Sequence, residues 1–392
     1  MDVEVAIIGG GAVGLAVAAE LSRDRQVAAT RSRQVATTRS RQVAVIERHG
    51  GFGLETSSHN SGVVHAGIYY PTGSLKHTLC IEGNRLLYEW CDAHNVRAHR
   101  LGKLIIAVDE TELDALEEVR ARAEANGVPE ISMIPEAARL RELEPAVRCV
   151  AAMFSATTGV VNQSALMASY AAEAESRGAW VALKHDVVAA SRITGGFELE
   201  MTGPDGAAVT VTCEALVNSA GLGAPAIASM LGYGLDGDGG TPRLRQTVNK
   251  GRYYDIVAPE KARALRHLVY PVPEHTKGGL GVHVTIDVDG GVHLGPDTEW
   301  LDDGAPLDYR ADDADDGRRE DFWRAAGRYL PSLELEDLAP GQVGYRPKLQ
   351  QPGGPQADFL IWHDRGYVHL GGIESPGLTA SPAIARRVAE IL

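Results

Sequence analysis

Cysteine, aromatic side chains and positive charge are all scarce in this chain. Its 392 residues include four cysteines, with no C-x-x-C pair, and 6% aromatic residues. A chain of this length can bury a core without disulfides, so we expect reduced, buried thiols. The 38 Lys and Arg against 52 Asp and Glu give a net charge of −14, the wrong sign for holding a polyanion across a broad surface. We therefore expect no nucleic-acid partner.

Long hydrophobic runs are also missing. The most apolar stretch, residues 5–21, is interrupted by glycines and falls short of the roughly 20 apolar residues that a membrane span needs. No basic leader precedes it. We expect no integral membrane segment and a cytoplasmic location, with peripheral membrane association left open. No set of His, Cys, Asp and Glu has the spacing of metal ligands, so we also expect no metal.

The N-terminal residues follow the order strand, glycine turn, helix. Residues 3–8 are β-type, and residues 15–21 are rich in Ala and Leu. Between them, Gly9 permits a tight turn, Gly11 lets the backbone approach a pyrophosphate, and Gly14 allows close packing of helix on strand. Unpaired N–H groups at the helix N-terminus favour an anion there. The spacing predicts a dinucleotide site, although a glycine-rich turn that binds nothing has the same pattern.

An acidic residue about 20 residues further on usually binds the ribose of a dinucleotide. Glu47 ends the apolar run 43–47, but it lies 38 residues after Gly9. The excess has a visible source, because residues 25–48 contain three copies of one eight-residue unit, RQVAATRS, RQVATTRS and RQVAVIER. Removal of two copies, 16 residues, would reduce the separation of Gly9 and Glu47 from 38 to 22 residues. Only the third copy is apolar enough for a buried strand, so we predict that residues 25–41 form an insertion loop.

Strands and helices alternate at both ends of the chain, whereas the middle is β-rich. At about 150 residues per domain, the length favours two domains. This order predicts an α/β nucleotide-binding domain, assembled from separated segments, with a β-rich substrate domain inserted between them. The periodicity predicts helices at 74–94, 110–126, 163–177 and 378–392, and strands at 102–108, 179–183, 196–201, 208–212, 215–219 and 367–370.

Residues 55–70, ETSSHNSGVVHAGIYY, resemble the flavin-facing motif of the D-amino-acid-oxidase-like flavoprotein superfamily. Within that superfamily, HNSGVVHAGIYY is most similar to the L-2-hydroxyglutarate dehydrogenase/oxidase family. Further blocks of the same family follow in order over nearly the whole chain: YPVP at 270–273, LGVH at 280–283, GYRPKL at 344–349 and GIESPGLTAS at 372–381. The eight-residue repeat, Gly278-Gly279 and residues 246–254 depart from the family pattern.

The resemblance implies a Rossmann-like FAD-binding domain with an inserted β-rich α+β substrate domain. It also implies FAD-dependent oxidation of L-2-hydroxyglutarate to 2-oxoglutarate by hydride transfer to the flavin. The expected domains are residues 1–80, 145–235 and 340–392 for FAD, and residues 81–144 and 236–339 for the substrate.

Several other functions are compatible with the same motifs. An amino-acid or amine oxidase, another L-2-hydroxy-acid oxidase and a catalytically inactive flavin-binding protein all remain open. A glycerol-3-phosphate dehydrogenase shares the fold but has no need of a carboxylate anchor, and an NAD-dependent dehydrogenase has no need of the flavin-facing motif. The sequence leaves open whether electrons pass to oxygen or to a quinone.

Oxidation of an α-hydroxy acid by a flavin needs a carboxylate anchor, a base for the hydroxyl proton and a fixed Cα–H. The resemblance implies that Arg346, in its G-x-R-P motif, is the anchor, because guanidinium binds carboxylate through two hydrogen bonds. His283 and His65 are the two candidates for the base. The further substrate contacts expected are Tyr70 and, for the second carboxylate of a diacid, Lys76, Lys250 and Arg252.

The FAD contacts are expected in five segments. Gly9, Gly11 and Gly14 should hold the pyrophosphate, and Glu47 the adenosine ribose. The resemblance also implies that a helix N-terminus near residue 377 faces the flavin pyrimidine, where it would stabilise negative charge on the reduced ring. The remaining expected contacts are Arg48, Ser57, Ser58, Asn60, Ser61, Ala220, Gly221, Gly372, Ile373, Gly377, Leu378 and Thr379.

Overall fold

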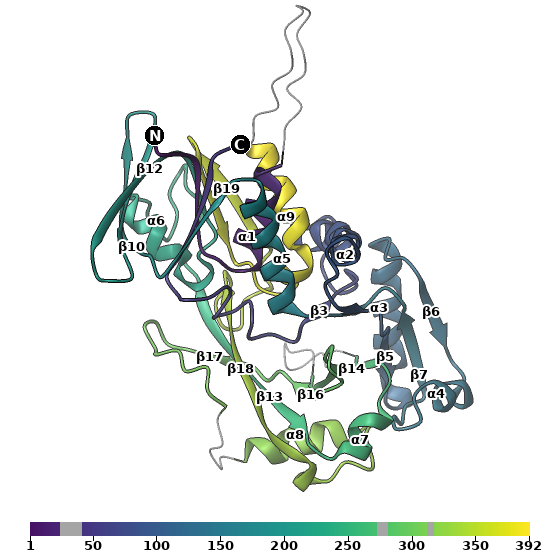
Figure 1. The fold of residues 1–392 in the computed structure, drawn as a ribbon. Coiled ribbons are helices and arrows are strands. Elements are labelled where there is room, and N and C mark those ends of the chain that lie inside the picture. Colours follow the sequence, from purple (N-terminus) through teal and green to yellow (C-terminus); the bar gives the residue numbers. More distant parts are fainter. Residues whose placement is uncertain (24–40, 273–280, 312–316) are drawn as a thin grey trace, which may run out of the picture.

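The computed structural model describes residues 1–23, 41–272, 281–311 and 317–392, and its strands form two large sheets and one small one (Figure 1). The first large sheet has a parallel centre in the order β20-β12-β1-β2-β9, and β10, β11 and β19 join it in antiparallel fashion. Its strands are β1 (Val3–Ile8), β2 (Val43–Glu47), β9 (Trp180–Leu183), β10 (Asp186–Ile193), β11 (Gly196–Thr202), β12 (Ala208–Asn218), β19 (Leu360–Asp364) and β20 (Tyr367–Gly371).

The centre of this sheet explains how the repeat is accommodated. β2 begins at Val43, inside the third copy, and pairs in parallel with β1 in the register Val5↔Val43. All five residues of β2 are buried, as expected for a strand covered on both faces. The prediction that the third copy forms the strand is confirmed. The predicted insertion loop 25–41 lies outside the described residues except for its last position.

Four helices pack on one face of this sheet: α1 (Ala12–Leu21), α2 (Leu75–His94), α5 (Gln163–Ser176) and α9 (Gly377–Ile391) (Figure 1). Gly14 brings α1 close to the preceding turn, since a Cβ there would collide with the Gly9 carbonyl oxygen. Gly83 does the same between α2 and α9, where a Cβ would collide with the Thr379 carbonyl oxygen. The other face is covered by the β10–β11 hairpin and by α6 (Ala224–Met230).

The second large sheet has the order β17-β13-β16-β15-β14-β5-β7-β6, with β18 paired along β13. Its strands are β5 (Lys103–Ala107), β6 (Ile131–Ile134), β7 (Ala151–Ser155), β13 (Thr247–Ile256), β14 (Leu268–Pro271), β15 (His283–Ile286), β16 (Val292–Gly295), β17 (Glu299–Trp300) and β18 (Leu338–Lys348). A small sheet joins β3 (Val63–Val64), β8 (Gly159–Val161) and β4 (Ala98–His99).

Side chains alternate between the two faces of the second sheet. Leu104, Val284 and Tyr254 pack with Phe322 of α8 (Arg318–Gly327) on one face. The opposite face carries Tyr270, which packs with β3 and the residues after it. The remaining helical elements of the described chain are α3 (Leu113–Ala125), α4 (Ala137–Leu143), α7 (Pro259–Ala264) and the 3₁₀ turns at Glu110–Glu112, Gly221–Gly223 and Leu335–Asp337.

Three predicted domain borders differ from the structure. The border at 80/81 falls inside α2, whose apolar face packs on α9 in the core of the first sheet. β7, predicted in the FAD-binding domain, pairs with β5 of the second sheet. β18, also predicted there from residue 340, runs along β13. The segments predicted as two strands at 208–212 and 215–219 form the single strand β12, which pairs with β11 in its first half and with β1 in its second.

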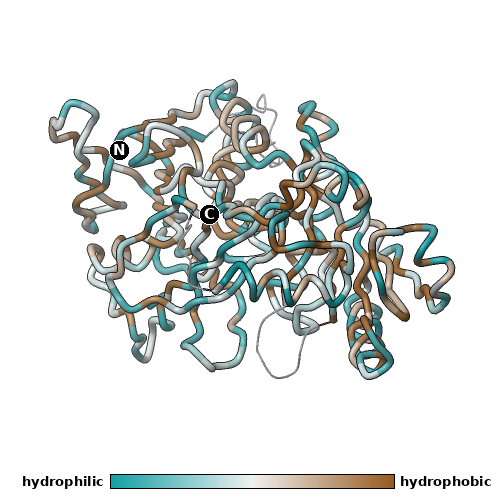
Figure 2. Tube along the Cα trace, turned by 90° about the horizontal axis from the view of Figure 1, so that it is seen from below, coloured by the Kyte–Doolittle hydropathy of each residue, from teal (hydrophilic) through white to brown (hydrophobic). Residues whose placement is uncertain are grey.

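Hydrophobic residues are frequent in the interior strands and helices, and hydrophilic residues are frequent in the outer loops (Figure 2). The four cysteines are unpaired; Cys80, Cys91 and Cys213 are buried as predicted, and Cys149 is half-buried. No helix in the described part of the chain is long and apolar enough to cross a membrane.

Candidate active site

The glycine turn forms a cradle at the carboxyl end of β1. Gly9 has a φ of +108°, and a Cβ there would lie 2.6 Å from the Ser219 carbonyl oxygen. A Cβ on Gly11 would lie 2.8 Å from the Ser57 hydroxyl oxygen. The first turn of α1 carries no acidic residue, so its N-terminal N–H groups face no fixed negative charge of that helix. The cradle therefore fits the pyrophosphate of a dinucleotide.

Glu47 lies beside this cradle at the end of β2. Its carboxylate is 7% exposed and accepts hydrogen bonds from the Gly10 N–H at 2.8 Å and the His49 N–H at 2.7 Å. This places an acidic group where the adenosine ribose of a dinucleotide is expected. Arg48 differs, because its half-exposed guanidinium pairs with Glu55.

The predicted polar segment after Glu55 builds a tight turn against α1. Ser57 Oγ accepts a hydrogen bond from the Ala12 N–H at 3.0 Å. Asn60 donates to the Thr56 and Ser57 carbonyl oxygens, and its own carbonyl accepts from the Gly62 N–H. The Ser57 and Asn60 side chains thus fix the backbone of the turn. Ser58 donates its N–H to the Gly53 carbonyl oxygen, and the Ser61 hydroxyl lies beside Tyr253.

Gln246, which the sequence did not single out, connects two predicted cofactor segments. Its amide donates to the Gly221 carbonyl oxygen at 2.9 Å and accepts from the Gly372 N–H at 2.7 Å. Ala220 itself lies against the glycine turn. The segments after β12 and β20 therefore meet, as the predicted FAD site requires. Ile373 packs against Gly377 at the start of α9, and Leu378 is partly buried there.

Thr379 joins the start of α9 to β3 and to the residue after it through two hydrogen bonds of its side chain. Its hydroxyl accepts a hydrogen bond from the His65 N–H at 2.9 Å and donates to the Val63 carbonyl oxygen. The first turn of α9 is therefore attached to β3 and to the backbone of His65. The His65 ring also reaches the loop before α9, with Nε2 3.3 Å from Ser375 Oγ.

Lys76, a sequence candidate for the second substrate carboxylate, already pairs with a carboxylate of the protein. The side chain is buried, and its Nζ lies 2.8 Å from Glu374 Oε1. Glu374 also pairs with Lys348 at 2.6 Å, so this buried cluster holds two cations and one carboxylate. Burial opposes ionisation of Glu374, but the two lysines hold the pKa of its carboxyl below the usual value. Tyr70 lies near this cluster, and burial raises the pKa of its phenol well above the usual value.

Arg346 and Arg252 differ in charge balance although both lie on the second sheet. Arg252 is 6% exposed and pairs with Asp297 at 3.1 Å and with Glu299. Arg346 donates to the Asn249 carbonyl at 2.6 Å and to the Asp297 backbone oxygen at 3.3 Å, and it forms no ion pair with any described residue. Its cationic fork is therefore the better match to a substrate carboxylate.

Two further features complete the neighbourhood of Arg346. Asn249 is fully buried, and its amide Nδ2 has no hydrogen-bond partner within the described chain. Gly251 leaves room for the guanidinium, since a Cβ there would collide with its Nη2. Lys250, the third sequence candidate for a distal carboxylate, lies within electrostatic reach of Asp308, a carboxyl whose pKa is lowered mainly by its hydrogen bonds with Arg310.

The two candidate bases lie close to each other. His283 is buried in β15 and stacks on Tyr270, with ring centres 3.7 Å apart. Burial lowers the pKa of His65 to about 3, and the charges of Lys103 and His283 add to this effect. His65 is therefore neutral near pH 7, which is the form that accepts a proton.

Lys103, a buried lysine within electrostatic reach of His65, was not singled out by sequence reasoning. It opens β5, is 1% exposed, and its Nζ lies 4.8 Å from the ring centre of Tyr69 and 4.7 Å from that of Tyr270. Burial lowers the pKa of the ammonium group to about 7. The available signal was a lysine at the start of the otherwise apolar run KLIIA.

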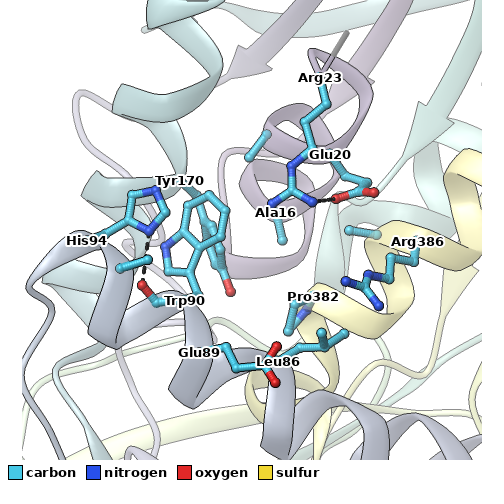
Figure 3. A pocket seen from close by; sticks show the side chains of 13 residues that line it. Ala16, Glu20, Arg23, Leu86, Glu89, Trp90, His94, Tyr170, Pro382 and Arg386 are labelled. Atoms are coloured by element: carbon cyan, nitrogen blue, oxygen red, sulfur yellow. Dashed lines mark hydrogen bonds and ion pairs between the residues drawn. The ribbon is translucent and has the colours of Figure 1, made fainter. Parts of the chain in front are cut away.

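A separate cavity of about 170 Å³ lies between α1, α2, α5 and α9 (Figure 3). Trp90 stacks on His94 at 3.8 Å, and Arg23 pairs with Glu20 at 2.8 Å. None of the predicted site residues lines it. The described residues also contain no group of three or more His, Cys, Asp or Glu arranged for a metal ion.

Comparisons with known proteins agree with this geometry. Residues 4–391 match the family model described as FAD dependent oxidoreductase. The chain is 35% identical to the mitochondrial L-2-hydroxyglutarate dehydrogenase of Arabidopsis thaliana, over 99% of this chain and 83% of the relative. It is 27% identical to the L-2-hydroxyglutarate dehydrogenase of an Escherichia coli strain, over 97% of this chain and 91% of the relative.

Solved structures show the same architecture. The FAD-bound L-α-glycerophosphate oxidase of Mycoplasma pneumoniae superimposes with a TM-score of 0.81 at 26% identity, over 100% of this chain and 94% of that chain. Glycine oxidase of Geobacillus kaustophilus superimposes with a TM-score of 0.74 at 22% identity, over 99% and 94% of the two chains. The predicted fold class is confirmed. The chain belongs to the FAD-dependent oxidoreductase family, within the group that contains the L-2-hydroxyglutarate dehydrogenases.

Proposed function

We propose that this chain oxidises L-2-hydroxyglutarate to 2-oxoglutarate. The observation that carries the proposal is Arg346, a cation without an ion pair among the described residues, on the sheet face that also presents His283. Relatives at 27–35% identity that act on L-2-hydroxyglutarate by name support the choice of substrate. Bound FAD supplies the acceptor for the hydride that leaves C2.

The roles of the protein groups follow from their charges. Arg346 binds the C1 carboxylate through its two outer nitrogen atoms, and the unpartnered Asn249 amide offers a further donor. His65, neutral at pH 7 and attached to the loop before α9, accepts the proton of the C2 hydroxyl. The anionic substrate beside it favours the protonated imidazole, so the pKa of His65 rises when substrate binds. His283, on the same sheet as Arg346, orients the substrate.

The remaining expected cofactor contacts stand as part of the same proposal. The glycine cradle and Glu47 hold the dinucleotide, and the segments joined by Gln246 lie along it. We further propose a cytoplasmic location, since the Escherichia coli relative is named without an organelle, whereas the plant relative is named mitochondrial. Fractionation of expressing cells, with detection of the chain in the soluble or membrane fraction, tests this location.

The test of the activity is anaerobic mixing of the FAD-loaded protein with single substrates. We expect rapid bleaching of the flavin absorbance by L-2-hydroxyglutarate and at least 100-fold slower bleaching by its D enantiomer, L-lactate, L-glutamate and glycerol 3-phosphate. The last compound is included because of the similarity to the glycerophosphate oxidase. Faster bleaching by L-glutamate or by glycerol 3-phosphate would overturn the proposed substrate.

A further inference from the structure

Lys103 is a buried cation that no described carboxylate neutralises. The two other deeply buried cations near the site, Lys76 and Arg252, pair with carboxylates at 2.8 Å and 3.1 Å. Among the described residues, Lys103 instead lies over the faces of two aromatic rings, with the thiol of Cys80 within electrostatic reach. Ring faces compensate part of the lost hydration of an ammonium group but do not replace an anion. The position therefore favours an anionic ligand.

A second donor lies beside this cation. The hydroxyl of Tyr69 is buried and has no hydrogen-bond partner within the described chain. Its ring is one of the two that lie under the Lys103 ammonium. An ammonium and a phenol hydroxyl together match the two oxygen atoms of a carboxylate.

These two donors lie in the proposed active site. Lys103 pairs across the sheet with Leu268, so its side chain lies on the same face as Tyr270, the ring on which His283 stacks. The charge of Lys103 also contributes to the lowered pKa of His65, so the two side chains lie close together. In the sheet order, β15 with His283 lies between β18 with Arg346 and β5 with Lys103.

Two tyrosines connect the two cations. Tyr253 lies within electrostatic reach of Arg346 and of Tyr270, and Tyr270 lies under Lys103. A substrate with a carboxylate at each end matches these two cationic positions in charge. A monocarboxylate can occupy only one of the two cationic positions.

We propose that Lys103, with the Tyr69 hydroxyl, binds the C5 carboxylate of the substrate and so selects hydroxy diacids over hydroxy monoacids. This inference rests on the proposed function, which assigns Arg346 to the C1 carboxylate. Lys103 then has the role, binding of the distal carboxylate, for which Lys76, Lys250 and Arg252 were the sequence candidates.

The test compares two substrates that differ only in the second carboxylate, L-2-hydroxyglutarate and L-2-hydroxypentanoate. Flavin reduction is measured anaerobically for the wild type and for Lys103→Met, Lys103→Arg and Tyr69→Phe, each loaded with FAD. Methionine keeps the length of the side chain and removes the charge, whereas arginine keeps the charge. FAD content and Tm of each variant show that it is folded.

We expect Lys103→Met to lower the second-order rate constant for the diacid at least 100-fold and to change that for the monoacid less than threefold. Lys103→Arg should retain more diacid activity than Lys103→Met, and Tyr69→Phe should lose about tenfold for the diacid alone. Equal losses for both substrates would show that Lys103 acts on the chemistry and would overturn the inference while the proposed function stands. A wild type that is reduced by the monoacid and not by the diacid would overturn both. If Lys103→Met does not fold, unchanged discrimination between diacid and monoacid in Tyr69→Phe would overturn the inference.

Discussion

Replacement of Arg346 by Lys should lower kcat/KM for every carboxylate substrate. The substitution keeps the positive charge but removes the guanidinium fork that makes two hydrogen bonds. Arg346 already uses Nη1 for the Asn249 carbonyl and Nη2 for the Asp297 backbone oxygen, so its remaining N–H groups are the ones that face a ligand. One charge-assisted hydrogen bond contributes about 1.5–3 kcal/mol. Loss of one of the two bonds to the carboxylate therefore predicts a decrease of about 10- to 150-fold in kcat/KM.

Arg346→Met should lower kcat/KM further than Arg346→Lys, since both hydrogen bonds and the charge are lost. We expect a decrease of at least 1000-fold, from about 4 kcal/mol or more. The assay is flavin reduction by L-2-hydroxyglutarate and by L-2-hydroxypentanoate, and both rate constants should decrease in parallel, unlike those of the Lys103 variants. Arg310→Lys, on a side chain that is 87% exposed, is the matched control. A kcat/KM of the Arg346→Lys protein within twofold of the wild-type value would refute the assignment of Arg346 as the carboxylate anchor.

The remaining predictions concern the cofactor, the base, pH and the repeat. Glu47→Ala should weaken FAD binding about tenfold, measured by fluorescence titration of the apoprotein, since the Gly10 N–H and the ribose both lose an acceptor; unchanged affinity would contradict the ribose role. His65→Asn should reduce the rate of flavin reduction about 10²- to 10⁴-fold with FAD content retained, and a loss below fivefold would exclude it as the base. Because the pKa of Lys103 is about 7, binding of the diacid should weaken as pH rises above that value, whereas binding of L-2-hydroxypentanoate should not; parallel pH profiles would contradict this. Deletion of residues 25–40 should leave FAD content and rate within twofold, because β2 begins at Val43; loss of FAD would refute the interpretation of the repeat.

Short-range patterns predicted the nucleotide-binding half of the molecule well. The glycine spacing, the apolar run before Glu47 and the helical periodicity each depend on residues close together in the sequence, and each has its expected place in the fold. The competition among the repeat copies could also be resolved, because only one copy is apolar enough for a strand with both faces buried.

The features that could not be predicted depend on contacts between residues far apart in the sequence. α2 belongs with the first sheet because Gly83 lets it approach α9, which lies almost 300 residues further along the chain. The ion pair of Lys76 could not be predicted because its partner, Glu374, comes from the loop before α9. Lys103 was overlooked because a lysine at the start of a buried strand has no motif, and only the absence of a described carboxylate around it indicates a ligand.

The most direct measurement is a single anaerobic turnover with limiting L-2-hydroxyglutarate, in which the flavin absorbance and the products are quantified together. The account predicts one equivalent of 2-oxoglutarate for each flavin bleached, and a rate that decreases in both the Arg346→Lys and the His65→Asn proteins. Flavin bleaching without 2-oxoglutarate, or full turnover in the His65→Asn protein, would contradict it.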